Sequence, residues 1–161
     1  MSKVYLSLGS NLGDKQRNLR FAISEIEQRC GKVELCSSFY STSPWGFDSD
    51  NEFVNIALSI TTALEPLALL NALKHIEQDA GRQQNAKSGY EDRPLDIDIL
   101  FYDNSIIDSE SLTVPHPRLH LRLFVLVPMN EIASQLMHPI LHKTIETLLL
   151  ECDDSTLICK M

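Results

Sequence analysis

The sequence has few features of secreted, nucleic-acid-binding or membrane proteins. Its four cysteines show no C-x-x-C spacing and lie in apolar segments, which favours reduced, mostly buried thiols over a zinc site or disulfides. A formal net charge of -8 disfavours nucleic acid as a main partner. The start of the chain lacks a secretory signal, and no apolar run is long enough to cross a bilayer. We therefore expect a cytoplasmic protein.

A known phosphate-binding motif is also missing. The turn at residues 9–15 lacks the G-x-x-x-x-G-K-[ST] spacing of a P-loop, so any ATP must be bound in another way. No internal repeat or low-complexity tract occurs. A length of 161 residues with 43% hydrophobic content fits one core, and we expect a single domain over residues 1–161.

Hydrophobic spacing and turn residues predict strands alternating with helices. The expected strands cover residues 3–9, 32–42, 52–63, 95–102 and 105–108, with another near 157, and the expected helices cover 14–30, 66–80 and 141–151. Prolines 115, 117 and 128 should break the chain into short pieces around 118–127. The order strand, helix, strand, strand, helix, strand predicts an α+β, ferredoxin-like sandwich: an antiparallel sheet with helices packed on it and C-terminal additions.

Two segments between these elements are unusual. Residues 43–48 are too long for a tight hairpin and unusually aromatic for a linker, so we interpret them as a candidate lid. Residues 82–94 are polar and are predicted to be irregular and mobile.

Asp96 and Asp98 are the strongest candidates for metal ligands. A strand period of two places both carboxylates on one face, with α-carbons about 6.5–7 Å apart, which suits a pair of magnesium ions. The pattern D-x-D is also short and common, and a solvated strand face often carries charge. Arginines nearby favour phosphate chemistry over that alternative. They are Arg82, Arg93, Arg118 and Arg122.

Phe53 and Asn55 share one face of another predicted strand, while the opposite face is plainly apolar. An aromatic ring beside an amide suits a flat heterocycle with several hydrogen-bonding edges. Spacing alone slightly favours a different interpretation, a second core under the helices.

Two further side chains remain open to more than one interpretation. Glu77 falls on the expected apolar face of a helix and needs a partner, which can be a ligand, a loop amide or an arginine, or its role can be purely structural. His116, between two prolines, can donate to phosphate or cap the next helix.

Four segments together resemble the 6-hydroxymethyl-7,8-dihydropterin pyrophosphokinase family. They are L-G-S-N-L-G at 8–13, S-F-Y-S-T at 38–42, R-P-L-D-I-D-I-L at 93–100 and V-P-H-P-R-L at 114–119. The resemblance implies two magnesium ions, ATP as diphosphate donor, and direct attack of the pterin hydroxymethyl oxygen on the β-phosphorus. AMP is then the leaving group, in a step of folate biosynthesis.

The resemblance also implies roles for particular residues. The metal ligands match Asp96 and Asp98, and the catalytic-loop arginines match Arg82 and Arg93. The pterin contacts match Thr42, Pro44, Trp45, Phe53, Asn55, Asp96 and Phe124, with Phe53 and Phe124 sandwiching the ring. The positions around ATP match Lys74, Glu77, Arg82, Arg93, Ile99, Thr113, His116 and Arg122.

Three departures from the family pattern concern the catalytic loop and ATP. A second arginine often present after Arg82 is replaced by Gln84, residues 90–92 read Y-E-D instead of W-G-P, and Lys74 stands where some members have glutamine.

The competing hypotheses are a non-catalytic ferredoxin-like module that binds a small ligand, and another D-x-D metal-dependent transferase. We expect a monomer.

Overall fold

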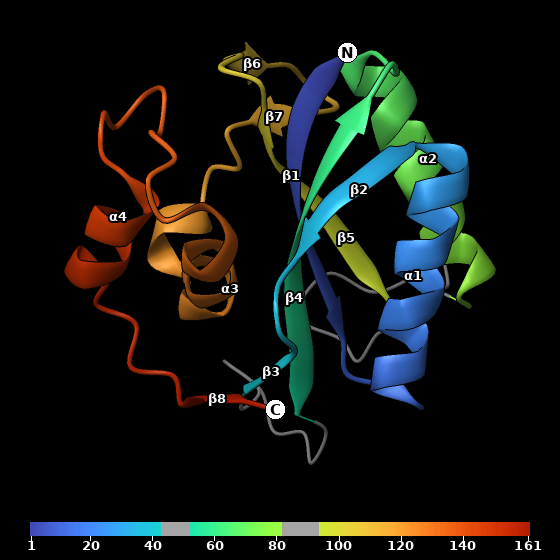
Figure 1. Ribbon diagram of the computed structural model, residues 1–161, viewed down its shortest axis with the longest axis horizontal. Helices are drawn as coiled ribbons and strands as arrows, with labels where there is room; N and C mark the ends of the chain where they lie inside the picture. Colours follow the sequence, from blue (N-terminus) through green and yellow to red (C-terminus); the bar gives the residue numbers. More distant parts are fainter. Residues whose placement is uncertain (43–51, 82–93) are drawn as a thin grey trace.

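An antiparallel sheet forms the centre of the protein in this computed structural model, which describes residues 1–42, 52–81 and 94–161. The sheet has the order β5-β1-β4-β3-β8, and β2 also pairs with β4. The strands are β1 (Ser2–Ser10), β2 (Gly31–Cys36), β3 (Tyr40–Thr42), β4 (Phe53–Thr62), β5 (Asp96–Tyr102) and β8 (Ile158–Lys160). Figure 1 shows helices on both faces of this sheet.

Two helices cover one face and enclose the larger core. Helix α1 (Lys15–Arg29) begins at Asp14, whose carboxylate accepts a hydrogen bond from the amide of Arg17 at 3.1 Å, and α2 (Pro66–Asp79) has proline in its first turn. Their apolar stripes pack on alternate residues of β1, β4 and β5. The buried strand residues include Val4, Leu6, Leu8, Val54, Ile56, Leu58, Ile60, Ile97 and Ile99.

The C-terminal elements cover the other face. Here η1 (Leu119–Leu121), α3 (Leu123–Ala133) and α4 (Ile145–Glu151) form a second, smaller core. A register shift near Tyr5 turns both Leu100 and Phe101 toward this core. Among the residues that the structure describes, no helix combines the length and apolarity that a membrane span needs.

The predicted ferredoxin-like order is confirmed, because β1, α1, β2, β4, α2 and β5 follow one another and bring β5 and β1 together at one side of the sheet. Two details of the strands differ from the prediction. The segment 32–42 divides into β2 and β3, and β6 (Ile107–Asp108) pairs with β7 (Thr113–Val114) instead of returning along β5.

The prediction that Pro128 breaks the chain was wrong, because α3 continues through it. Proline lacks the amide that would pair with the carbonyl of Phe124. Pro128 is buried, and burial of its neighbours Leu126 and Met129 in the second core offsets that loss. The last helix begins at Ile145, later than predicted, because residues 138–143 form a turn in which Nδ1 of His138 accepts from two backbone amides.

Candidate active site

Polar residues line up across the sheet on the face that α3 covers. Asp96 on β5 lies opposite Gly9 on β1, Gly9 lies opposite Asn55 on β4, and Asn55 lies opposite Tyr40 on β3. Asp98 lies opposite Ser7 in the next row on that face. The second core that spacing alone favoured is present at one end of this face, and this polar group lies at the other end.

The amide of Asn55 is held in one orientation. Its Nδ2 donates to Oγ1 of Thr42 at 3.3 Å, and both residues are buried. A Cβ atom on Gly9 would lie 2.6 Å from Oδ1 of Asn55, so only glycine leaves room for this side chain. The hydrogen bond assigns nitrogen to the Thr42 side, which leaves Oδ1 beside Gly9. Sequence reasoning missed Gly9, although a glycine inside a strand indicates a close approach.

Glu77 reaches the edge of the sheet from α2. Glu77 is only 5% exposed to solvent, and its Oε2 accepts a hydrogen bond from the amide of Ile97 at 2.7 Å. Ile97 stands between the two aspartates, so Glu77 holds the strand that carries them. This partner is a strand amide, which was not among the predicted partners of Glu77.

Asp96 and Asp98 are half-buried and project to the opposite face from Ile97. Across the described ranges 1–42, 52–81 and 94–161, no group of three or more His, Cys, Asp and Glu side chains could hold a metal ion. Two carboxylates alone suit magnesium, which usually keeps waters and takes further oxygens from substrate phosphates. The donor set therefore fits the expected metal if a polyphosphate binds here too.

His116 and Arg122 bring positive charge and a hydrogen-bond donor toward Asp96. The backbone amide of His116 donates to the carbonyl of Leu100 at 3.0 Å, and its Nδ1 accepts from the amide of Arg118 at 3.2 Å. Burial, followed by the charges of Arg122 and Arg118, lowers the pKa of His116 to about 4 against the opposing effect of Asp96. The imidazole is therefore neutral at pH 7, with its proton on Nε2.

This state of His116 can be tested by NMR on the protein without nucleotide. The pKa of His116 in the folded protein lies below its unfolded value of about 6.5. Between these two pH values the unfolded chain therefore binds more protons than the folded chain. His116 then contributes stability above about pH 6.5 that is lost as the pH falls toward 4. We expect the ring protons of His116 to keep constant shifts from pH 8 to about 5.5 and to titrate near 6.5 in urea. A folded-state midpoint near 6.5 would contradict the assignment.

Phe53 and Phe124 come from different elements. Phe53 begins β4 beside Thr42, and Phe124 lies in the first turn of α3. The guanidinium of Arg122 lies over the ring of Phe124, 5.5 Å from its centroid. Arg122 thereby connects the aromatic residue to His116, whose pKa responds to the charge of Arg122.

The remaining predicted contacts are more scattered. Lys74 is exposed on α2, and Thr113 is exposed on β7. The side chain of Ile99 is buried in the larger core, so any ATP contact would use its backbone at the sheet edge, where Glu77 meets Ile97. Four predicted residues and the departures from the family pattern in the loop lie outside the described residues. They are Pro44, Trp45, Arg82, Arg93, Gln84 and residues 90–92.

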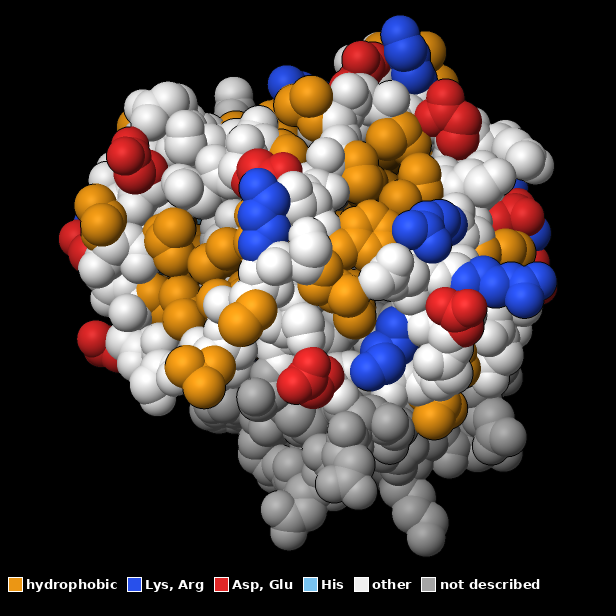
Figure 2. All heavy atoms as spheres, turned by 60° about the horizontal axis from the view of Figure 1, so that its bottom comes forward, with side chains coloured by type: hydrophobic (Ala, Val, Ile, Leu, Met, Phe, Trp, Pro, Cys, Tyr) orange, Lys and Arg blue, Asp and Glu red, His pale blue; other side chains and the backbone are white. Residues whose placement is uncertain are grey.

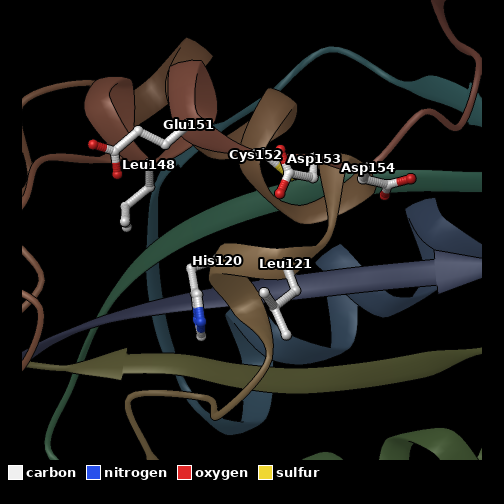
Figure 3. A pocket seen from close by; sticks show the side chains of 7 residues that line it. All are labelled: His120, Leu121, Leu148, Glu151, Cys152, Asp153 and Asp154. Carbon is white, nitrogen blue, oxygen red and sulfur yellow. The ribbon is translucent and has the colours of Figure 1, made fainter.

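A separate cavity of about 170 Å³ lies between η1, α4 and the segment that follows α4. Figure 3 shows its lining residues, which include His120, Cys152 and Asp154. None of these residues was predicted to belong to the site. On the surface turned forward in Figure 2, acidic and basic side chains are interspersed around hydrophobic ones, and neither sign forms a broad patch among the coloured residues.

The fold and this group of residues define a ferredoxin-like domain with a polar, two-aspartate site at one end of its sheet. The chain belongs to the 7,8-dihydro-6-hydroxymethylpterin-pyrophosphokinase (HPPK) family, whose sequence model matches residues 5–134. The predicted resemblance is thereby confirmed.

Several relatives share about two fifths of their residues with this chain. The 2-amino-4-hydroxy-6-hydroxymethyldihydropteridine pyrophosphokinase of Porphyromonas gingivalis is 41% identical over 141 residues, covering 86% of this chain and 95% of the relative. The Bacillus subtilis enzyme of that name is 41% identical and covers 82% and 78%. The Haemophilus influenzae enzyme is 42% identical and covers 86% of both chains.

Solved structures confirm the fold. A crystal structure of HPPK-DHPS in complex with substrates has a TM-score of 0.74 and 17% identity, covering 93% of this chain and 43% of that chain. The wild-type Plasmodium falciparum HPPK-DHPS with pteroate has a TM-score of 0.75 and 16% identity, with coverage of 93% and 42%. This chain therefore spans less than half the length of these structural neighbours.

Proposed function

We propose that this protein transfers the diphosphate of ATP to the hydroxymethyl group of 6-hydroxymethyl-7,8-dihydropterin and releases AMP, a step of folate biosynthesis. Membership of the HPPK family and relatives named as pyrophosphokinases support this activity. In this chain, the observation that supports the proposed activity is the row of Asp96, Gly9 and Asn55 across three neighbouring strands. In that row a carboxylate and an amide lie on one face, two strands apart, and the proposal assigns the carboxylate to metal-bound phosphate and the amide to the heterocycle.

The pterin is proposed to lie between Phe53 and Phe124. One ring edge would meet Asn55 and Thr42, whose mutual hydrogen bond fixes donor and acceptor directions. The proposed pterin contacts are completed by Asp96 and by Pro44 and Trp45, which follow Thr42 in the chain. Such a site combines stacking area with directional polar groups, as sites for flat heterocycles do.

Asp96 and Asp98 are proposed to hold two magnesium ions together with the phosphates of ATP. The bound ions would neutralise phosphate charge and orient the reacting groups. Glu77 positions the strand between the two aspartates through the amide of Ile97. Lys74, Ile99, Thr113 and Arg122 complete the proposed ATP contacts around β5 and β7.

In the proposed reaction the hydroxymethyl oxygen forms a bond to the β-phosphorus while the bond from that phosphorus to the α,β-bridging oxygen breaks. The hydroxyl proton is released, and AMP leaves with the bridging oxygen. His116 would donate from Nε2 to a phosphate oxygen, and Arg122 would add positive charge. Arg82 and Arg93 are proposed to stabilise the charge that shifts as the bond breaks.

Incubation with ATP, magnesium and the reduced pterin tests the proposal directly. We expect equal amounts of AMP and diphosphorylated pterin, and no ADP. Formation of ADP, or release of AMP without change to the pterin, would point to another transferase. Binding of the pterin with no turnover would favour a non-catalytic binding module.

Phe53→Ala and Phe124→Ala are expected to weaken pterin binding selectively. Stacking on one aromatic ring contributes about 0.5–1.5 kcal/mol beyond its buried area, so truncation, which also loses that area, should raise the Kd at least about tenfold. ATP affinity measured without pterin should barely change. Calorimetry on folded variants would measure both affinities, and equal losses for both ligands would identify the two rings as core residues.

The remaining proposals concern the state of the protein. We propose that residues 1–161 act as one domain and as a monomer, which light scattering during gel filtration would test. A location in the cytoplasm stays a prediction from the sequence.

A further inference from the structure

Helix α3 connects the two sides of the pterin site proposed between Phe53 and Phe124, so its role here rests on the proposed function. Its first residues follow Arg122, which lies near His116 beside β5. Its last turn carries Glu131, which contacts the segment leading into β3. Figure 1 shows α3 nearly end-on beside strands that run within the plane, so the helix crosses them.

Simple lengths agree with this crossing. Nine residues of helix, from Arg122 to Glu131, rise about 13.5 Å. Three strand spacings, from β5 through β1 and β4 to β3, cover about 14–15 Å. The helix is therefore long enough to reach across the four strands of the row from Asp96 to Tyr40, and it contacts β4 and β3 directly.

Glu131 is bonded at the β3 end by three donors. Its Oε2 accepts from the backbone amide of Ser38 at 2.8 Å and from the Ser38 hydroxyl at 3.1 Å, and its Oε1 accepts from the hydroxyl of Tyr40 at 2.5 Å. Burial raises the pKa of Glu131, but the bonds from Tyr40 and Ser38 outweigh it and leave the pKa lowered. Burial and the bond to Glu131 raise the pKa of Tyr40 to about 12, so its hydroxyl stays a donor.

Tyr40 is directly connected to the proposed pterin contacts. It lies opposite Asn55 in the sheet, and Thr42, two residues later on the same strand face, accepts the hydrogen bond from Asn55. On the helix, Phe124 precedes Glu131 by seven residues and lies on the same side of α3, two turns away. The carboxylate of Glu131 thus fixes α3, which carries Phe124, to β3, which carries Thr42.

We infer that Glu131 is a positioning residue for the pterin site, which sets the distance from Phe124 to Thr42 and Asn55 through its bonds to Ser38 and Tyr40. In this proposal Glu131 contacts neither the pterin nor ATP. Its loss should therefore widen the pterin site without removing any pterin contact.

Five variants test this inference: Glu131→Ala, Glu131→Gln, Tyr40→Phe, the double variant of Glu131→Ala with Tyr40→Phe, and Glu146→Ala as a control. Glu146 is an exposed glutamate on α4 whose carboxylate accepts from Gln135 at 2.9 Å, so the control also removes a carboxylate that bonds the chain just after the end of α3. The measurements are thermal unfolding, Kd for the pterin with a non-hydrolysable ATP analogue bound, Kd for the analogue alone, and kcat.

Glu131→Ala and Tyr40→Phe should each raise the pterin Kd about threefold to tenfold, while the analogue Kd changes less than about twofold. The double variant should be no weaker than Glu131→Ala, because both changes remove parts of one connection. Glu131→Gln, which keeps an acceptor for Ser38, should recover part of the affinity. The control should leave the pterin Kd unchanged.

Two results would overturn the inference alone. A lower unfolding temperature with an unchanged pterin Kd would reduce Glu131 to a structural contact, and additive losses in the double variant would show that the two residues act separately. Wild-type protein that binds no pterin and forms no AMP would overturn the proposed function together with this inference.

Discussion

Asp96→Asn and Asp98→Asn should each lower AMP formation by about a thousandfold or more at saturating ATP and pterin. Each change removes one negative charge from the only two carboxylates that project together from β5. Metal ions contribute several kcal/mol of charge stabilisation in a transition state, and each 1.36 kcal/mol is a factor of ten in rate. Turnover should therefore collapse in both variants, as measured by AMP formation under single-turnover conditions.

The fold of both variants should survive. The two side chains are half-buried at the surface of β5, and asparagine has nearly the same shape. Unfolding temperatures without magnesium should therefore match that of the wild type, and calorimetry should show weaker binding of the magnesium complex of an ATP analogue. Most of the wild-type AMP formation in either variant would contradict the two-metal assignment, and a large fall in unfolding temperature would show that the carboxylates serve the fold.

Local periodicity explains why these two aspartates could be found in the sequence. A strand repeats every two residues, so the alternation in residues 95–99 assigns Asp96 and Asp98 to one face and Ile97 to the other before any partner strand is known. The same alternation applies to the strand predicted over residues 3–9, where the structure buries Val4, Leu6 and Leu8 in the larger core. Such predictions need no knowledge of which strands pair.

Contacts between distant residues could not be predicted in this way. Glu77 and Ile97 are separated by 20 positions and Tyr40 and Glu131 by 91, and nothing local connects them. Both carboxylates lie on helices that dock against strands, so their partners depend on where each helix sits along the sheet. The continuation of α3 through Pro128 has a similar cause, because tertiary burial outweighs the local cost of proline.

Pairing across the sheet also explains why only some predicted site residues meet. Register brings Asn55, Gly9 and Asp96 into one row, although they come from three separate strands. Lys74 and Thr113 depend on elements outside that row and remain exposed. The family resemblance named Asn55, Asp96, Lys74 and Thr113 as site residues, whereas strand pairing accounts for the positions of Asn55, Gly9 and Asp96.

Gly9→Ala should weaken pterin binding about tenfold to hundredfold, the scale of losing one or two well-placed hydrogen bonds. A Cβ at this position would stand 2.6 Å from Oδ1 of Asn55 and 3.7 Å from its Cγ, whereas the nearest backbone atom, the carbonyl oxygen of Val54, is 3.9 Å away. The strand can therefore accept the methyl group, but the Asn55 amide must rotate away. Its bond to Thr42 is then lost, and its donor and acceptor no longer face the pterin edge.

Alanine is favoured over glycine inside a strand by about 0.5–1 kcal/mol, so this variant should stay folded, and ATP affinity measured without pterin should be unchanged. Gly13→Ala provides the matched control, since Gly13 has a φ of 73° and no atom within 3.9 Å of the added Cβ except Nδ2 of Asn18 at that distance. It should lower stability through backbone strain and leave pterin affinity intact.

Asn55→Ala should reproduce the loss of pterin affinity seen in Gly9→Ala. Combining the two changes should add no further loss, because both act through the amide of Asn55. Full additivity would mean that Gly9 serves the site by another route, and equal losses for ATP and pterin would mean that the methyl group distorts the sheet itself.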